Sequence, residues 1–303
     1  MTLLDGKVAI ITGAGQGLGR SHALELAGLG ASIVVNDLGK DADTGEALAD
    51  KVVAEIKAAG GDAVAHNQSC SNWDAAKAMV DLAVDTFGRL DILVNNAGIL
   101  RDRMSFKMSE ADWDAVIDVH LKGHFAPTHH AAVYWREQAK AGNPIAGRII
   151  NTSSESGLFG NVGQANYAAA KAGIVGLTLV MARELEKLGV TSNAIAPRAF
   201  TAMTENLMGP LMAQFEGSDF NPVATENVSS VVAWLASDES AHVNGQTFIV
   251  WGDEVQWVSP HLLYNTIKAG ERRFEPDELT AATKELFAGR ESGVPAFGVQ
   301  PIN

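Results

Sequence analysis

Three residues in the middle of the chain have the types and spacing of a proton-transfer site. Ser154 follows the apolar run 147–152, Tyr167 lies thirteen residues after the serine, and Lys171 lies four residues after the tyrosine. On a helix, a four-residue step places Tyr167 and Lys171 on one face. A lysine ammonium there favours the phenolate and lowers the pKa of the phenol. The set predicts acid/base chemistry on a substrate alcohol whose oxygen Ser154 holds; the alternative is a surface Tyr and Lys on an Ala-rich helix.

A glycine turn near the N-terminus predicts phosphate binding. The β-branched run 7–12 is typical of a buried strand, and it leads through three glycines, spaced Gly-x-x-x-Gly-x-Gly, into a helical pattern at 20–27. Glycines let the backbone approach a pyrophosphate, and the N-terminus of the helix supplies N–H donors. We expect this turn to bind a dinucleotide through Gly13, Gln16, Gly17, Leu18 and Gly19.

The end of the second apolar strand, 31–36, indicates which dinucleotide binds. Asp37 follows this strand, where a carboxylate binds the hydroxyls of the adenosine ribose and repels a 2′-phosphate. Gln16, rather than a basic residue, occupies the middle of the glycine turn. Both features favour NAD as the cofactor. Lys40 lies near enough to weaken this preference, and a simple loop carboxylate is the alternative for Asp37.

Alternating strands and helices predict the fold that positions these residues. Four βα units within about the first hundred residues indicate an α/β fold, a single-domain Rossmann-type doubly wound parallel sheet of about seven strands flanked by helices. We expect the catalytic domain over residues 1–250 and a C-terminal helical extension, 251–303, packed on the same domain.

Several segments carry more detailed expectations. Helices are expected at 44–59, 73–87, 109–141, 164–188 and 227–236, with amphipathic pieces around 261–268 and 276–287. In the 109–141 span, Ser109 is the expected N-cap, and Pro127 marks a kink or a helix start. The Met-rich stretch 200–222 is expected to form either an adaptable cover over an apolar ligand or an ordinary helix and loop.

Composition narrows the possible partners. The 303 residues carry 23 basic and 36 acidic side chains, a net charge of −13, which argues against nucleic acid and anionic membranes. The single cysteine, Cys70, excludes an internal disulfide framework and a Cys-based zinc cluster, and no other metal site is expected. No uninterrupted apolar run approaches the roughly 18 residues of a membrane span. We expect a cytoplasmic enzyme with a small-molecule substrate.

The order and spacing of the motifs resemble those of the short-chain dehydrogenase/reductase superfamily over about residues 5–250. The motifs are Thr12-Gly13-x-x-x-Gly17-x-Gly19, Asn95-Asn96-Ala97-Gly98, Ser154 and Tyr167-x-x-x-Lys171. The resemblance implies that Tyr167 is the general acid/base and that Lys171 modifies its pKa and binds the nicotinamide ribose. Ser154 would position the substrate, and the stretch from Asn95 to Gly98 would steady the central sheet beside the cofactor.

A narrower resemblance concerns substrate class. Segments 36–39, 98–103, 119–123 and 160–167 are similar to the (3R)-hydroxyacyl-CoA dehydrogenase unit of the peroxisomal multifunctional enzymes type 2, also called 17β-hydroxysteroid dehydrogenase type 4. This implies oxidation of a 3-hydroxyacyl-CoA or a steroid-like apolar alcohol with NAD. The alternatives are an NADPH-dependent 3-oxoacyl-thioester reductase and, outside catalysis, a dinucleotide-sensing scaffold.

The chain departs from the superfamily pattern at three places. His120 stands where the fourth catalytic residue is usually Asn; in the family that residue acts through its carbonyl, which anchors a water leading to the lysine, and a histidine keeps the carbonyl. Ser69 and Cys70 replace the Asp that contacts adenine. Pro197 is followed by Arg198 rather than Gly, and Thr201 is the residue that we expect to contact the nicotinamide amide.

Two further expectations concern partners. Arg101, Arg103 and Lys107 follow the 95–98 strand end and could form a cationic rim for the phosphates of coenzyme A. Salt bridges to Asp102, Glu110 or Asp112 are the alternative. The apolar helices at 112–139 and 164–188 predict a homodimer or homotetramer, as in the family, unless the tail from Trp251 covers them within one chain.

Overall fold

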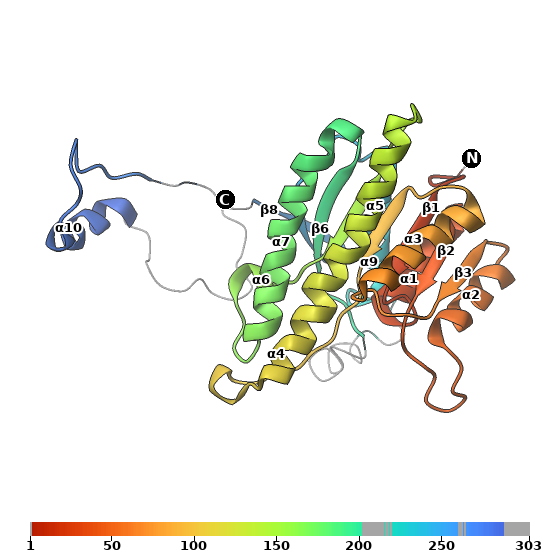
Figure 1. The fold of residues 1–303 in the computed structure, drawn as a ribbon. Coiled ribbons are helices and arrows are strands. Elements are labelled where there is room, and N and C mark those ends of the chain that lie inside the picture. Colours follow the sequence, from red (N-terminus) through yellow and green to blue (C-terminus); the bar gives the residue numbers. More distant parts are fainter. Residues whose placement is uncertain are drawn as a thin grey trace.

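The protein is an eight-stranded α/β sheet covered by helices on both faces (Figure 1). The computed structural model describes residues 2–201, 215, 218, 220–259, 263 and 265–287. The strands are β1 (Val8–Thr12), β2 (Ser32–Asn36), β3 (Ala63–His66), β4 (Ile92–Asn95), β5 (Arg148–Thr152), β6 (Thr191–Pro197), β7 (Thr247–Trp251) and β8 (Glu254–Val258). The main helices are α1 (Gly17–Gly28), α2 (Leu48–Ala58), α3 (Trp73–Phe87), α4 (Glu110–Ile117), α5 (Gly123–Lys140), α6 (Glu155–Phe159), α7 (Ala165–Leu185), α9 (Thr225–Ala236) and α10 (Pro276–Phe287).

The sheet has the doubly wound order β3-β2-β1-β4-β5-β6-β7-β8. All neighbours are parallel except β7 and β8, which pair antiparallel. The central strands are buried along their length because helices cover both faces. Alternate residues of β1 face opposite layers: Ile11 packs with α1, α2 and α9, whereas Ile10 packs with α3, α5 and α7. The expected Rossmann-type fold is therefore confirmed.

The span expected as one helix over 109–141 is divided in two. Ser109 caps α4 as expected, in a capping box with Asp112. A π-helical turn, Asp118–Lys122, then separates α4 from α5. Pro127 lies in the second turn of α5, near its start, and the interruption falls upstream at the π turn. Such turns insert one extra residue and often occur at functional sites.

Other boundaries differ for local reasons. α2 begins at Leu48 rather than at residue 44, because Asp41 accepts hydrogen bonds from the backbone N–H groups of Asp43 and Thr44 and holds 41–44 in a turn. The eighth strand, β8, was not anticipated; Gly252, with φ of +57°, lets the chain turn back and pair Trp251 with Glu254. Residues 227–236, expected as a helix, lie within α9.

The C-terminal extension is described in part. Residues 276–287 form α10, as expected, and Figure 1 shows this helix away from the sheet. Around 261–268, the described residues 263 and 265–268 belong to no helix or strand. Packing of the extension on the catalytic domain stays a prediction. Apart from residues 215, 218 and 220–222, the Met-rich stretch beyond Thr201 lies outside the described residues.

The segment 165–188, which comprises α7 and a terminal 3₁₀ turn, is long and apolar enough to span a bilayer by length and composition alone. The sequence had not suggested such a segment. Ile174, Thr178 and Met181 on this helix are buried, and the helix packs against β5 and β6. These contacts are those of a core helix in an α/β domain.

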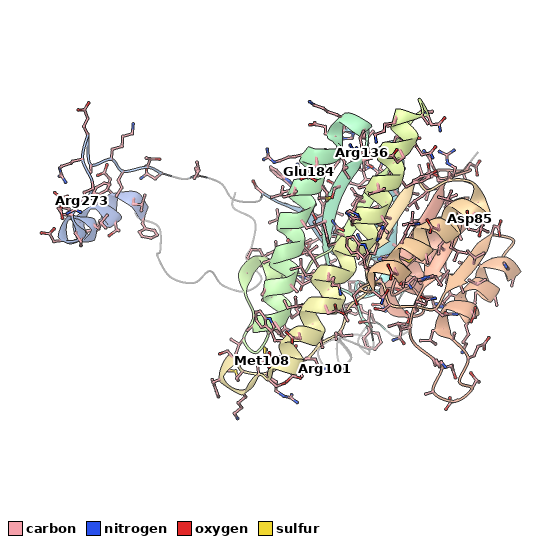
Figure 2. All side chains as sticks on the ribbon, in the orientation of Figure 1. Asp85, Arg101, Met108, Arg136, Glu184 and Arg273 are labelled. Atoms are coloured by element: carbon pink, nitrogen blue, oxygen red, sulfur yellow. The ribbon has the colours of Figure 1, made fainter. Side chains whose placement is uncertain are left out.

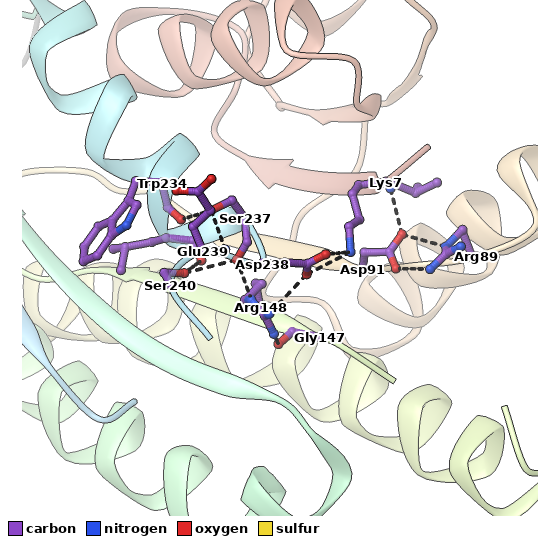
Figure 3. A network of polar contacts seen from close by, with 12 residues as sticks. Lys7, Arg89, Asp91, Gly147, Arg148, Trp234, Ser237, Asp238, Glu239 and Ser240 are labelled. Atoms are coloured by element: carbon purple, nitrogen blue, oxygen red, sulfur yellow. Dashed lines mark hydrogen bonds and ion pairs between the residues drawn. The ribbon is translucent and has the colours of Figure 1, made fainter. Parts of the chain in front are cut away.

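An ion network lies at the amino ends of the central strands (Figure 3). Arg148, at the start of β5, is 3% exposed and donates to the carbonyls of Gly147 and Ser237, both at 3.0 Å. Asp238 pairs with Arg148 at 3.3 Å and with Lys7 at 3.0 Å. Nearby, Asp91 accepts from Arg89 and from the backbone N–H of Val8. Each charged group named here has a polar partner.

Candidate active site

The glycine turn between β1 and α1 is shaped by close backbone contacts. Gly13 and Gly17 have φ of +63° and +53°, in the left-handed region that favours glycine. A Cβ on Gly13 would lie 2.7 Å from the Cα of Ala97, and a Cβ on Gly19 would lie 2.0 Å from the carbonyl oxygen of Gly13. The hydroxyl of Thr12 accepts hydrogen bonds from the N–H groups of Asn96 and Ala97, which ties the turn to the end of β4.

Asp37 lies at the carboxyl end of β2 beside the same turn. Its two carboxylate oxygens accept hydrogen bonds from the backbone N–H groups of Gly15 at 2.8 Å and Gly39 at 2.7 Å. These bonds fix the carboxylate at the edge of the cavity, and each oxygen keeps a lone pair for another donor. The geometry fits the diol of a ribose. The side chain of Lys40 is exposed.

One cavity of about 450 Å³ joins this turn to the predicted proton-transfer residues. Most of the predicted site residues line it: Gly13, Gln16, Gly17, Leu18, Asp37, Ser69, Cys70, Ala97, Gly98, His120, Ser154, Tyr167, Lys171, Pro197 and Thr201. Gly19 and Asn95 lie behind its wall. Asn95 is fully buried and donates to Asn151 and Thr128, so it joins β4 to β5 and α5. The glycine turn has no side chains to block a pyrophosphate, and the cavity beside it ends at the fixed carboxylate of Asp37. This arrangement fits a dinucleotide, which the residues lining the cavity would hold.

The proton-transfer residues come from β5, α6 and α7. Ser154 caps α6 directly beyond β5, and its Oγ accepts from the N–H of Ser156 at 3.2 Å. Tyr167 and Lys171 lie one turn apart on α7, with Lys171 Nζ 5.5 Å from the centre of the tyrosine ring. The ammonium donates to the carbonyl of Thr152 at 2.6 Å, and the Lys171 side chain is almost completely buried. The structure brings all three residues to the wall of one cavity.

Burial dominates the proton affinities of this pair. It raises the pKa of Tyr167 to about 12, against a hydrogen bond from Ser154 that lowers it. Burial also lowers the pKa of Lys171 to about 7. Desolvation disfavours the charged form of each group, so it opposes the lowering of the phenol pKa that the sequence predicted. The site instead holds a phenol and an amine that are both costly to ionise.

A family model described as short chain dehydrogenase matches residues 7–209, which include the glycine turn and all three proton-transfer residues. The chain belongs to the short-chain dehydrogenase family. It is thus an oxidoreductase on a fold that binds a nicotinamide dinucleotide.

Individual relatives narrow the placement within the family. The chain is 50% identical to hydroxyacyl-CoA dehydrogenase ChsB1 of Mycobacterium tuberculosis over 292 residues, which is 96% of this chain and 91% of that protein. It is 44% identical to the mouse (Mus musculus) peroxisomal multifunctional enzyme type 2 over 259 residues, 84% of this chain and 33% of that larger protein. A crystal structure of a short chain dehydrogenase from Mycobacterium avium superposes with a TM-score of 0.88 at 49% identity, covering 98% of this chain and 100% of the other. The narrower resemblance seen in the sequence is confirmed.

In this short-chain dehydrogenase, His120 stands in the π turn with its ring against that of Tyr167. The two rings meet edge to face with centres 5.1 Å apart. Nε2 of His120 lies 2.8 Å from the carbonyl oxygen of Ile99, and burial lowers the pKa of the imidazole to about 3, so the ring is neutral. A Cβ on Gly98 would lie 2.4 Å from this ring, which explains the glycine at that position.

The other departures from the family pattern also have structural consequences. Arg198 forms a two-pronged ion pair with Glu155, at 2.5 and 2.6 Å, and its guanidinium lies 5.4 Å from the ring centre of Trp251. The pair ties the loop after β6 to the residue that follows Ser154. Ser69 Oγ lies 3.0 Å from Ser71 Oγ, so a hydroxyl is present where the family carries an Asp.

Sequence reasoning missed several residues of the cavity wall. They flank the predicted positions: Asn36, Leu38, Gly39, Gln68, Ile99, Val119, Thr152, Ser153 and Ala199. For Ser153, the available signal was its position directly before Ser154. The side chain of Ser153 donates to the carbonyl of Lys171 at 2.9 Å, a contact between β5 and α7 that spacing alone does not reveal.

Proposed function

We propose that this protein is an NAD-dependent dehydrogenase that interconverts a secondary alcohol and a ketone on a 3-hydroxyacyl-CoA or a similarly bulky apolar substrate. The observation that carries the proposal is the single cavity in which Ser154, Tyr167 and Lys171 adjoin the glycine turn and Asp37. The name of the Mycobacterium tuberculosis relative, a hydroxyacyl-CoA dehydrogenase, supports the substrate class.

In the proposed oxidation, the substrate loses a hydride and a proton, and the alcohol carbon becomes a carbonyl. The nicotinamide supplies the hydride acceptor when it is bound. Ser154 holds the alcohol oxygen, and deprotonated Tyr167 takes the hydroxyl proton; in the reverse direction the tyrosine returns it. Lys171 favours the phenolate when it is protonated, and the buried setting strengthens that interaction by excluding water.

Asp37 supports NAD as the cofactor. Its carboxylate is already fixed by two backbone N–H groups and would meet a 2′-phosphate as a like charge at close range. We expect kcat/KM with NAD to exceed that with NADP by at least about tenfold, because one charge repulsion at this distance is worth more than about 1.4 kcal/mol. Asp37→Ala should narrow the gap. Equal efficiency with both cofactors in the unmutated protein would refute the assignment.

Two arginines support a coenzyme A thioester. Arg101 and Arg103 are exposed, and their guanidinium groups donate to the neighbouring carbonyls of Leu100 and Asp102. Neither forms an ion pair with a carboxylate within the described part of the chain, so the structural salt bridges considered above are not formed there. The backbone of Arg103 pairs with that of Gln164, three residues before Tyr167, which places the arginine backbone beside the N-terminal end of α7.

The thioester assignment can be tested by comparison of two substrates. Neutralising both arginines, Arg101→Gln with Arg103→Gln, should raise KM for a 3-hydroxyacyl-CoA by about tenfold, the effect of two partly screened phosphate contacts. KM for a small uncharged alcohol should change little. Arg136→Gln is a matched control, because Figure 2 shows Arg136 at the opposite end of the molecule from Arg101. Equal increases for both substrates would mean that the arginines are structural.

We also propose that the protein is a homodimer or homotetramer. Phe125, Val133 and Val180, on α5 and α7, are 39%, 47% and 46% exposed. A largely apolar hollow lies beside them, lined by Ile117, Leu121, Lys122, Phe125 and Leu177. A monomer in light scattering at micromolar concentration would contradict this.

A further inference from the structure

The cavity follows the carboxyl ends of neighbouring strands in a fixed order. Across the sheet the strands run β3-β2-β1-β4-β5, and the cavity is lined beyond them, in the same order, by Ser69, Asp37, the glycine turn, residues 97–98 and Ser154. A nicotinamide dinucleotide has a matching linear order of base, ribose, pyrophosphate, ribose and nicotinamide. Because the proposed proton transfer takes place beside the nicotinamide, the purine base belongs at the β3 end, near Ser69.

A chain of hydrogen bonds connects Ser69 to the π turn. Ser71 Oγ donates to Oδ2 of Asp118, and Ser69 Oγ lies 3.0 Å from Ser71 Oγ. The Ser71 side chain is buried, whereas Asp118, the first residue of the π turn, is partly exposed. The second carboxylate oxygen of Asp118 accepts from Lys122 Nζ at 3.1 Å. Asp118 thus reaches the wall of the cavity through a buried serine.

The carboxylate fixes the direction of each hydrogen bond in this chain. A carboxylate only accepts, so Ser71 gives its single hydroxyl hydrogen to Asp118. Ser71 Oγ then offers Ser69 only lone pairs, and Ser69 is the donor between the two hydroxyls. The backbone N–H of Ser71 occupies one lone pair of Ser69 Oγ at 3.3 Å. One lone pair of Ser69 Oγ is left for the cavity, so this hydroxyl meets a ligand as an acceptor.

This arrangement differs from that of a serine without a carboxylate behind it. A free hydroxyl can turn its hydrogen toward a carbonyl or its lone pair toward an amine. Ser69 cannot, because its hydrogen is committed to Ser71. Hydrogen bonds in a chain also polarise one another, so the carboxylate makes Ser69 a stronger acceptor. Leu38 and Val119 line the same cavity and offer apolar surface to the faces of a base.

We propose that Asp118 is a positioning residue for the base of the cofactor: through Ser71 it holds Ser69 as an acceptor, and the site thereby selects a purine that presents an amino group. Adenine presents an amino group where hypoxanthine presents a carbonyl oxygen. The inference rests on the proposed function, since the site contacts a base only if the cavity binds the dinucleotide.

The test compares the dissociation constants of NAD and nicotinamide hypoxanthine dinucleotide, which carry the same charge and differ only in the base. Isothermal titration calorimetry measures both without turnover. Wild type should bind the hypoxanthine dinucleotide about tenfold more weakly, the size of one lost hydrogen bond that leaves two acceptors facing each other. In Asp118→Asn the amide can donate to Ser71, which frees the hydrogen of Ser69, and the ratio should fall to about threefold or less. Ser71→Ala breaks the chain and should lower the ratio in the same way, so it serves where Asp118→Asn does not fold.

Lys122→Gln is the matched control. It removes the other partner of Asp118 and changes the charge of the same turn, but it leaves the bond to Ser71, so the ratio should stay at its wild-type value. Equal binding of the two dinucleotides by wild type, or one ratio shared by wild type, Asp118→Asn and Ser71→Ala, would overturn the inference. Gln68, which also lines the cavity and can donate or accept, would then be the residue to examine. Binding of neither dinucleotide would refute the proposed function as well, so the two failures are distinguishable.

Discussion

The two ends of the central sheet hold their buried charged groups differently. At the amino ends, Arg148 is buried with two carbonyls and Asp238 as partners. At the carboxyl ends, Lys171 is buried with the Thr152 carbonyl as its acceptor, and His120 and His124 have ring nitrogens without partners among the described residues.

We propose that this difference separates the groups that stabilise the fold from the groups that take part in the proposed chemistry. A paired buried charge keeps its ordinary protonation state and holds elements together. A buried group with too few partners has a shifted pKa, which a proton-transfer site can use near neutral pH. Perturbed groups also reduce stability, so they are expected where function requires them.

The largest effect is expected at the carboxyl end, on rate. Tyr167→Phe removes the acid/base hydroxyl and should lower kcat by about 10²–10⁴-fold while NAD still binds. Steady-state turnover and NAD titration by fluorescence measure the two quantities. Near wild-type turnover in the Phe variant would show that another group transfers the proton.

At the amino end, the expected effect is on stability. Arg148→Met leaves the carbonyls of Gly147 and Ser237 without their donor, and the free energy of unfolding should fall by about 1–3 kcal/mol. kcat/KM at a temperature where the variant is folded should stay within about twofold of wild type, since the network lies at the far end of the strands. Denaturant unfolding and turnover on the same preparation test this. A loss of activity in the fully folded variant would show that the amino end of the sheet also contributes to catalysis, and would contradict the contrast between the two ends.

An effect of pH on stability should also distinguish the two ends of the sheet. His120 has a folded pKa of about 3 and an ordinary value of 6.5. Because the unfolded chain binds the proton more readily, its contribution to stability is present above pH 6.5 and is lost as the pH falls toward 3. The loss amounts to at most about 1.4 kcal/mol per pH unit. His120→Asn should make the decline of unfolding free energy below pH 6.5 less steep, whereas Arg148→Met should leave its slope unchanged. An unchanged slope in His120→Asn would contradict the assigned protonation.

The sequence was informative where chemistry depends on residue type and short spacing. The glycine turn, Asp37 and the Ser154, Tyr167 and Lys171 set could be predicted because strand ends and helical turns place them. The π turn could not, because its extra residue lies within a continuous helical pattern. β8 was missed because Val255 and Trp257 are 53% and 64% exposed. The strand therefore lacks the alternation of buried and exposed residues by which a strand is recognised in a sequence.

Burial was the main property that the sequence did not reveal. The lysine four residues after Tyr167 suggested a depressed phenol pKa, whereas burial is the largest cause of the pKa shift of both groups. The same holds for His124, whose type is ordinary in a helix and whose complete burial depends on strands far away in the chain.

The most direct test is the thermal unfolding midpoint of Lys171→Met at pH 7, measured beside Arg148→Met. The pKa of Lys171, lowered to about 7 by burial, means that the folded protein holds this lysine against its preference for solvent. Methionine has a similar shape and no charge, so the variant should be more stable by about 1–3 kcal/mol and should lose turnover. A midpoint that falls as far as that of Arg148→Met would show that Lys171 is a structural residue like those at the other end, and would contradict the account.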